Sequence, residues 1–248
     1  MADQLYLSLW YPNFRFEALP AALTCVLRQF ANVASAGAGA NAYSKRVATT
    51  TVYPISFNES PTYQRIYVND DRAKENPDTA GSIIEDAVAE AAEYLHDDMA
   101  VEFEMRWNLW TPDISPAAPA EAQLDTLWRL EPRTVRILGF GPEFDDAGYE
   151  QNGHIRIDFG LDTPWILDAD EDDRLDADRD PITGHYNRRD PQLRHDEQTS
   201  RRIQQNVELL LAFTLSVEKN CGISSRLLWT ESGEPLAEKL IARLQRLN

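Results

Sequence analysis

The sequence is poor in cysteine, with only Cys25 and Cys221 among its 248 residues. Cys25 falls inside an amphipathic helical pattern, and Cys221 stands in the tetrapeptide KNCG at the expected end of a helix. This pair has neither the spacing of a zinc site nor the density of a disulfide framework. We therefore expect no disulfide framework, and a reducing cytoplasmic location fits best.

Long apolar runs are also missing from the sequence. No stretch approaches the roughly 20 apolar residues that span a bilayer. The first residues, MADQLYLSLWYPNF, carry no basic group ahead of their apolar part, as a secretion signal would. The sequence thus predicts a soluble protein without a secretion signal and without a membrane partner.

Basic residues are scarce relative to acidic ones. Lysine and arginine together number 24 against 41 aspartates and glutamates, which gives a formal net charge of −17. Such a charge repels phosphate backbones and anionic lipids, so nucleic acid is excluded as an expected partner. The same charge favours association with a basic protein.

Alternating apolar residues predict several strands. The clearest is the segment AVEFEMRWNLW, in which Val101, Phe103, Met105, Trp107 and Leu109 are expected to be buried, and Glu102, Glu104 and Arg106 to be exposed. Further strands are expected at LYLSLWY, RVATTTVYPISF, TYQRIYV, TLWRL, TVRILGF, HIRIDF and ISSRLLW. These segments predict an α+β fold with a mainly antiparallel sheet and helices packed on one face.

Helical periodicity appears between these strands. It predicts helices after Leu19, after Ser82, from about Ser200 to Glu218, and from about Pro235 to the end. Gly222 is expected to stop the third of these helices. The segment ASAGAGANA, residues 34–42, follows a helix instead of a strand, so it predicts a flexible connection and not a phosphate-binding loop.

A proline-spaced run, TPDISPAAPAEA, divides the chain. It predicts a linker at 112–123 between an N-terminal half, 1–111, and a C-terminal half, 124–248, although both halves can also form one compact domain. Segments 51–111 and 134–230 share the order strand, strand, helix, strand. They suggest an internal duplication, in which an insertion at about 160–198 enlarges the second copy.

The most acidic stretch of the chain lies within this insertion. Residues 168–180 hold eight carboxylates, of which Asp168, Asp170 and Asp172 match the first ligand positions of a calcium-binding EF-hand loop. Asp173 stands where that loop needs glycine, and Arg179 stands where it needs a bidentate glutamate. We therefore predict a dispensable solvated insertion, with no metal or other cofactor bound.

Two further pairs of residues are candidates for a site. His185 and His195 stand among carboxylates in the same insertion, and Trp110 and Trp229 end two expected strands, where they could line a pocket between the halves. No serine or cysteine stands in a recognisable nucleophile motif nearby. The sequence favours a non-catalytic binding protein with an acidic surface over its alternative, a metal-dependent hydrolase that uses residues 168–196.

Overall fold

The computed structural model describes residues 3–37, 50–56, 66–68, 80–112, 128–144, 152–165 and 191–232. These residues form a seven-stranded sheet in the order β3-β2-β4-β5-β6-β1-β7, and every neighbouring pair is antiparallel. The strands are β1 (Gln4–Trp10), β2 (Thr50–Ser56), β3 (Ile66–Val68), β4 (Met99–Pro112), β5 (Trp128–Phe140), β6 (Ile155–Leu161) and β7 (Ser225–Thr230). The helices are η1 (Phe16–Ala18), α1 (Leu19–Gly37), α2 (Ala80–Ala92) and α5 (Pro191–Asn220).

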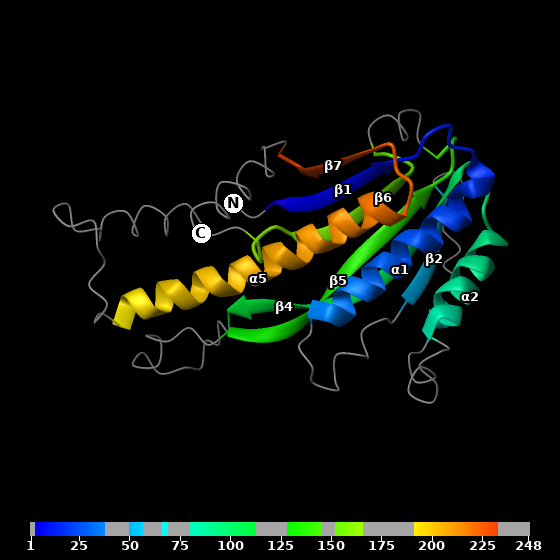
Figure 1. The fold of residues 1–248 in the computed structure, drawn as a ribbon. Coiled ribbons are helices and arrows are strands. Elements are labelled where there is room, and N and C mark those ends of the chain that lie inside the picture. Colours follow the sequence, from blue (N-terminus) through cyan, green and yellow to red (C-terminus); the bar gives the residue numbers. More distant parts are fainter. Residues whose placement is uncertain are drawn as a thin grey trace.

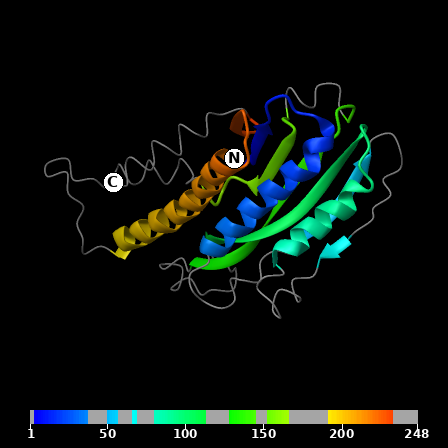
Figure 2. The same ribbon diagram turned by 45° about the vertical axis from the view of Figure 1, so that its right-hand side comes forward.

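The helices α1, α2 and α5 all lie on one face of this sheet, as Figures 1 and 2 show from two directions. Their apolar stripes meet the inward side chains of the strands in one buried cluster, which includes Leu7, Leu27, Val101, Ile157 and Phe213. The predicted α+β fold, with an antiparallel sheet and helices on one face, is confirmed.

Strand β4 has the predicted orientation. Val101, Phe103, Met105, Trp107 and Leu109 are each at most 1% exposed. Arg106 is exposed as predicted, whereas Glu102 and Glu104 are only partly exposed. The difference arises because Arg136 of the neighbouring strand β5 lies across both glutamates.

The two predicted halves are interleaved in the sheet. β4 pairs with β5 along its whole length, from Ala100 opposite Phe140 to Pro112 opposite Trp128. β1, the first described strand, belongs to the first predicted half, but it lies between β6 and β7, which both belong to the second half. A single sheet therefore runs through both predicted halves, and the linker at 112–123 does not separate two sheets.

The predicted duplication is matched in the order of elements but not in the order of strands. Segment 51–111 contains β2, β3, α2 and β4, and segment 134–230 contains β5, β6, α5 and β7. In the first segment the last strand pairs with the first, whereas β7 pairs with β1 and not with β5. The duplication stays a hypothesis, and this strand order counts against it.

Three predicted boundaries are wrong. The described part of TLWRL, residues 128–130, and the segment TVRILGF belong to the single strand β5. This strand accommodates Pro132 because β6 pairs only with residues 136–139. α1 continues to Gly37, into the segment predicted as a flexible connection. α5 begins at Pro191, so the expected insertion ends earlier than predicted. The acidic run at 168–180 and the closing helix predicted from Pro235 lie outside the described residues.

Cys25 and Cys221 form a disulfide bond, contrary to the expectation from the sequence. Their Cα atoms are 5.7 Å apart although the residues are separated by 196 positions. The pairing arises because α1 packs against α5, which brings the middle of the first helix to the end of the last described one. Gly222 follows with φ of 63°, so the predicted glycine stop of α5 is confirmed.

Candidate interaction surface

The face of the sheet opposite the helices carries polar and aromatic side chains in two rows. The first row crosses five strands through Glu104, Arg136, Asp158, Tyr6 and Trp229, which are successive partners in the strand register. The second row runs parallel to it through Glu102, Leu138, Arg156, Ser8 and Leu227. We call these ten residues the polar face.

Two aromatic rings pack against each other, with their planes tilted, at the β1–β7 side of the polar face. The centroids of the Tyr6 and Trp229 rings are 4.6 Å apart. The indole Nε1 of Trp229 donates a hydrogen bond of 3.0 Å to the hydroxyl of Ser8, which is fully buried beneath it. Both rings remain partly exposed. Because the contact between the rings and the hydrogen bond to Ser8 fix their orientation, these aromatic side chains would lose little conformational entropy on binding a partner.

Arg156 lies between two aromatic rings near the centre of the polar face. Its Cζ atom is 5.4 Å from the centroid of Tyr6 and 5.3 Å from that of Phe140, both within the range of cation–π attraction. One terminal nitrogen donates a hydrogen bond of 3.0 Å to the side chain of Asn152. The guanidinium group is therefore held at the same time by Tyr6 of β1, by Phe140 of β5 and by Asn152, three residues before the start of β6.

Charged side chains cover the β4–β5 side of the polar face. The Nε atom of Arg136 lies 3.9 Å from a carboxylate oxygen of Glu102 and 3.8 Å from one of Glu104. Asp158 accepts a hydrogen bond of 2.8 Å from the backbone amide of Gly160. Three carboxylates and two arginines thus alternate across neighbouring strands. Their pairing is loose, because the side chain of Arg136 is 52% exposed.

Burial changes the acidity of two groups on the polar face. The pKa of Glu102 is raised, first by desolvation, while the nearby Arg136 opposes this shift. Desolvation also raises the pKa of Tyr6, and the charges of Asp158 and Glu231 add to that rise. A cation brought close to these carboxylates would favour the ionised form of Glu102 and reduce the repulsion that it feels from Glu104.

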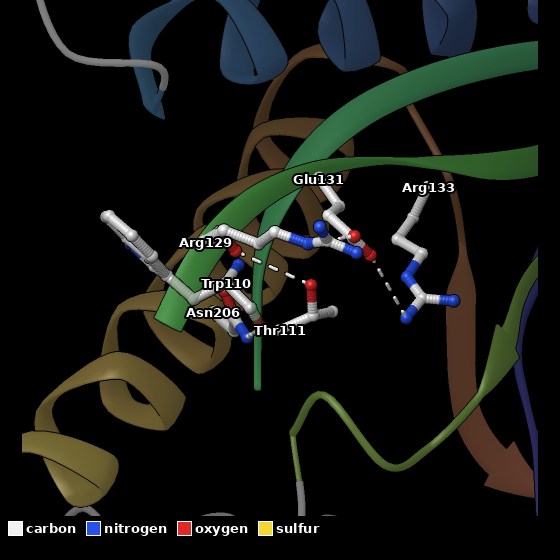
Figure 3. A network of polar contacts seen from close by, with 6 residues as sticks. All are labelled: Trp110, Thr111, Arg129, Glu131, Arg133 and Asn206. Carbon is white, nitrogen blue, oxygen red and sulfur yellow. Dashed lines mark hydrogen bonds and ion pairs between the residues drawn. The ribbon is translucent and has the colours of Figure 1, made fainter. Parts of the chain in front are cut away.

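The two tryptophans predicted to share a pocket lie in different surroundings. Trp229 belongs to the polar face, whereas Trp110 lies near the end of β4 against α5. There the Cζ atom of Arg202 is 3.6 Å from the centroid of the Trp110 ring. Figure 3 shows Trp110 beside Asn206, whose side chain is bonded to the backbone of Trp110. No contact described in the structure joins Trp110 to Trp229.

The same end of the β4–β5 hairpin holds a small charged group. Glu131 lies 2.5 Å from Arg129 and 3.9 Å from Arg133, and the hydroxyl of Thr111 donates to the carbonyl oxygen of Arg129 at 3.4 Å. In Figure 3 these charged side chains extend away from Trp110. They order the hairpin end and are separate from the polar face in the strand register.

Of the remaining predicted site residues, the structure places only the backbone of His195. Asp168, Asp170, Asp172 and His185 lie outside the described residues. His195 lies within the helix α5 and not in a loop, which corrects the sequence prediction, and its side chain is outside the description. Within the described part of the chain, no group of three or more histidine, cysteine or acidic side chains is arranged to hold a metal ion.

Sequence reasoning missed most of the polar face. The alternation in β4 and β6 identified their outward residues, but it could not show that Tyr6, Ser8 and Arg156 would meet. These side chains come together only because β1 lies beside β6 in the sheet, although most of the chain separates the two strands. One sequence pattern could have indicated this face. In β1 the leucines alternate with Tyr6 and Ser8, so these two residues face outward while the leucines face the core.

Comparison of the chain with protein-family models, with curated proteins and with solved structures gives no match. Among the described helices, none is both long and apolar enough to cross a membrane. The geometry of the polar face is therefore the basis for a functional proposal.

Proposed function

We propose that the protein is a non-catalytic binding protein whose polar face contacts a basic protein partner. The observation that carries this proposal is the row of Glu104, Arg136, Asp158, Tyr6 and Trp229 across neighbouring strands. Tyrosine, tryptophan and arginine are the residue types that most often dominate binding energy at protein interfaces. Here they are partly exposed and mounted on a sheet, which keeps them in one arrangement.

Charge supports a basic partner. The net charge of −17 attracts a cationic protein from a distance and raises its association rate. On the polar face itself, Glu102 and Glu104 are paired only loosely with Arg136, and Asp158 is partly exposed. These three carboxylates are therefore available to lysine or arginine side chains of the partner. Leu227, which is 52% exposed, offers an apolar contact at the edge of the same face.

A random-peptide display library tests the proposal without a known partner. Peptides selected on the immobilised protein should be enriched in lysine and arginine. Their affinity should fall by about 30-fold or more in Trp229→Ala, because an interface hot spot contributes at least about 2 kcal/mol. Leu215→Ala is the matched control, since Leu215 is 56% exposed on α5, on the helical side of the sheet.

Two results would contradict the proposed function. One is enrichment of acidic or uncharged peptides on the wild-type protein. The other is binding that is lost in Leu215→Ala but survives both Trp229→Ala and the double variant Glu102→Gln, Glu104→Gln, which removes two negative charges. In the second case the binding surface would be on the helices.

The alternative of a metal-dependent hydrolase stays a prediction. Its expected residues, 168–196, lie outside the described part of the chain except for the first residues of α5. Calorimetric titration with calcium, magnesium and zinc tests it directly.

A cytoplasmic location is kept as part of the proposal. In that compartment glutathione and thioredoxin keep most thiols reduced, so the bond between Cys25 and Cys221 would form there only under oxidising conditions. Trapping free thiols by alkylation in intact cells tests the location, because a permanently oxidised pair would indicate a compartment outside the cytoplasm.

A further inference from the structure

The disulfide lies at the point where α5 passes into the edge strand β7. Cys221 follows the last residue of α5, and its amide still donates to the carbonyl oxygen of Val217. Three residues later, both the amide and the hydroxyl of Ser224 donate to the carbonyl oxygen of Trp10 at the end of β1. The turn between α5 and β7 is thus attached to α1 by the disulfide and to β1 by hydrogen bonds.

Apart from its pairing with β1, the first half of β7 is held by an exposed ion pair, in which Arg226 donates to Glu218 of α5 at 3.1 and 2.8 Å. Ser225, Arg226 and Leu227 are all exposed, whereas burial increases toward Thr230. β7 pairs only with β1 among the strands that the structure describes. At its far end, the amide of Ser232 donates to the carboxylate of Asp3. An edge segment without buried side chains opens at low free-energy cost, so the attachment of the preceding turn determines its order.

The contact between α1 and α5 does not depend on the disulfide alone. One turn after Cys25, the side-chain oxygen of Gln29 accepts hydrogen bonds from Ser216 at 2.7 Å and from Asn220 at 3.0 Å. Apolar residues of both helices, including Phe30 and Phe213 with ring centroids 5.3 Å apart, pack in the core. The two helices should therefore remain packed when the disulfide is reduced.

We propose that Cys25 and Cys221 form a reversible thiol–disulfide switch that controls the order of the first half of β7. In the oxidised form the turn is fastened to α1 and the strand keeps its register on β1. In the reduced form the core stays folded, while residues 225–227 open frequently. The switch is a local change at the edge of the sheet.

The oxidant is a low-molecular-weight disulfide such as oxidised glutathione. The partly exposed Cys25 attacks it as a thiolate and releases one thiol, which leaves a mixed disulfide on Cys25. The thiolate of Cys221 then attacks the Cys25 sulfur and releases the second thiol. Both cysteine sulfurs are oxidised and both sulfurs of the oxidant are reduced, and the two cysteine protons end on the released thiols. Reduction follows the reverse course.

Hydrogen exchange on the full-length chain tests the switch. The protein is equilibrated in glutathione buffers of graded ratio, its free thiols are counted by alkylation and mass spectrometry, and amide exchange is followed in parallel. Amides of residues 225–227 should exchange about tenfold faster or more in the reduced form, while those of β4 and β5 keep their protection. The variants Cys25→Ser and Cys221→Ser should reproduce the reduced pattern in every buffer.

Three outcomes would overturn the inference. Equal exchange of residues 225–227 in both forms would make the disulfide a passive cross-link. Loss of protection throughout the sheet on reduction, or in both serine variants, would make it a requirement for folding. A disulfide that is reduced only after denaturation would exclude reversible control.

A consequence for binding rests on the proposed function. Trp229 and Leu227 lie on β7, so reduction should weaken the binding of a lysine-rich or arginine-rich peptide to the polar face. If peptide binding is absent but exchange still responds to the disulfide, the proposed function fails and the switch stands. If binding is present and does not respond, the switch does not regulate the polar face.

Discussion

The side chain of Asn206 on α5 is joined to both backbone polar groups of Trp110 on β4. Its Oδ1 accepts from the Trp110 amide and its Nδ2 donates to the Trp110 carbonyl, each at 2.9 Å. The same Nδ2 donates to the carbonyl of Pro164 at 2.8 Å. Asn206 is 2% exposed. Its side chain satisfies the backbone hydrogen bonds that a neighbouring strand would make, at the part of β4 that extends beyond its pairing with β2.

Replacing Asn206 should destabilise the fold strongly. Asn206→Ala leaves the amide and carbonyl of Trp110 and the carbonyl of Pro164 without this partner, and we expect the free energy of unfolding to fall by about 3 kcal/mol. Asn206→Asp should also destabilise, because it keeps an acceptor but buries a charge and loses both donors. Urea denaturation measures both values.

Glu208→Ala on the same helix is the control for Asn206. Glu208 is exposed and bonded to Gln204, so its loss should change stability by less than about 0.5 kcal/mol. Equal effects of Asn206→Ala and Glu208→Ala would show that Asn206 does not hold the edge of β4.

Two glycines with nearly the same backbone angle should respond differently to alanine. Gly153 has φ of 80° and Gly160 has φ of 78°. A Cβ atom on Gly153 would lie 2.7 Å from the carbonyl oxygen of Leu9, whereas one on Gly160 would meet nothing within 4 Å. Both variants incur the strain of a positive φ, at about 1 kcal/mol, but only Gly153→Ala must also displace β1.

Thermal unfolding of both variants measures this difference. We expect Gly153→Ala to lose at least about 1 kcal/mol more than Gly160→Ala, because the crowded atoms are backbone and cannot rotate away. Comparable losses in the two proteins would indicate that backbone strain alone is important at Gly153.

His154 should make the stability of the protein depend on pH. Its Nδ1 accepts a hydrogen bond of 3.0 Å from the amide of Tyr11, and its ring stacks on Phe14 with centroids 4.0 Å apart. Burial lowers the pKa of His154 below its ordinary value. The folded state therefore favours the neutral ring, and the unfolded state binds the proton first.

The stabilisation from neutral His154 is present above the unfolded pKa of about 6.5 and is lost as the pH falls below it. Chemical denaturation between pH 5 and pH 8 should show this decrease in the wild type. His154→Phe should flatten the pH dependence, whereas His96→Gln at an exposed position serves as the control. An unchanged slope in His154→Phe would contradict the assignment.

The acidic run should be dispensable for folding. Replacing Asp168, Asp170 and Asp172 together by asparagine should change the free energy of unfolding by less than about 0.5 kcal/mol, as surface substitutions usually do. Calorimetric titration with calcium, magnesium and zinc should give no saturating site. A site of micromolar or tighter affinity that is lost in the triple variant would support the metal-dependent alternative.

The sequence predicted the strands better than it predicted the contacts between them. Alternation with a period of two assigned the buried and outward sides of β4 correctly, because residues such as Phe103 and Trp107 must face a core. It predicted α5 only from its apolar part near Ile203, and the polar residues before that point carry no apolar stripe that would mark a helix.

Sequence patterns could not predict contacts between residues that are far apart in the chain. Nothing in the residues near Cys25 or Cys221 indicates that α1 and α5 pack together and bring these cysteines into contact, although 196 positions separate them in the sequence. Asn206 is a polar residue on the buried side of a helix, and its role becomes apparent only when β4 lies beside it. The polar face likewise depends on strand register, which local alternation does not determine.

The position of β1 has a consequence for folding during synthesis. Leu7 pairs with Ile157 and with Leu228, at separations of 150 and 221 residues (157 − 7 and 228 − 7). β1 therefore leaves the ribosome before β6 and β7, and both of its edges are paired only after both of these strands have been made. Until then its row of leucines is exposed to other chains, so crowded nascent chains and slow translation of the C-terminal region are the conditions under which this protein should aggregate.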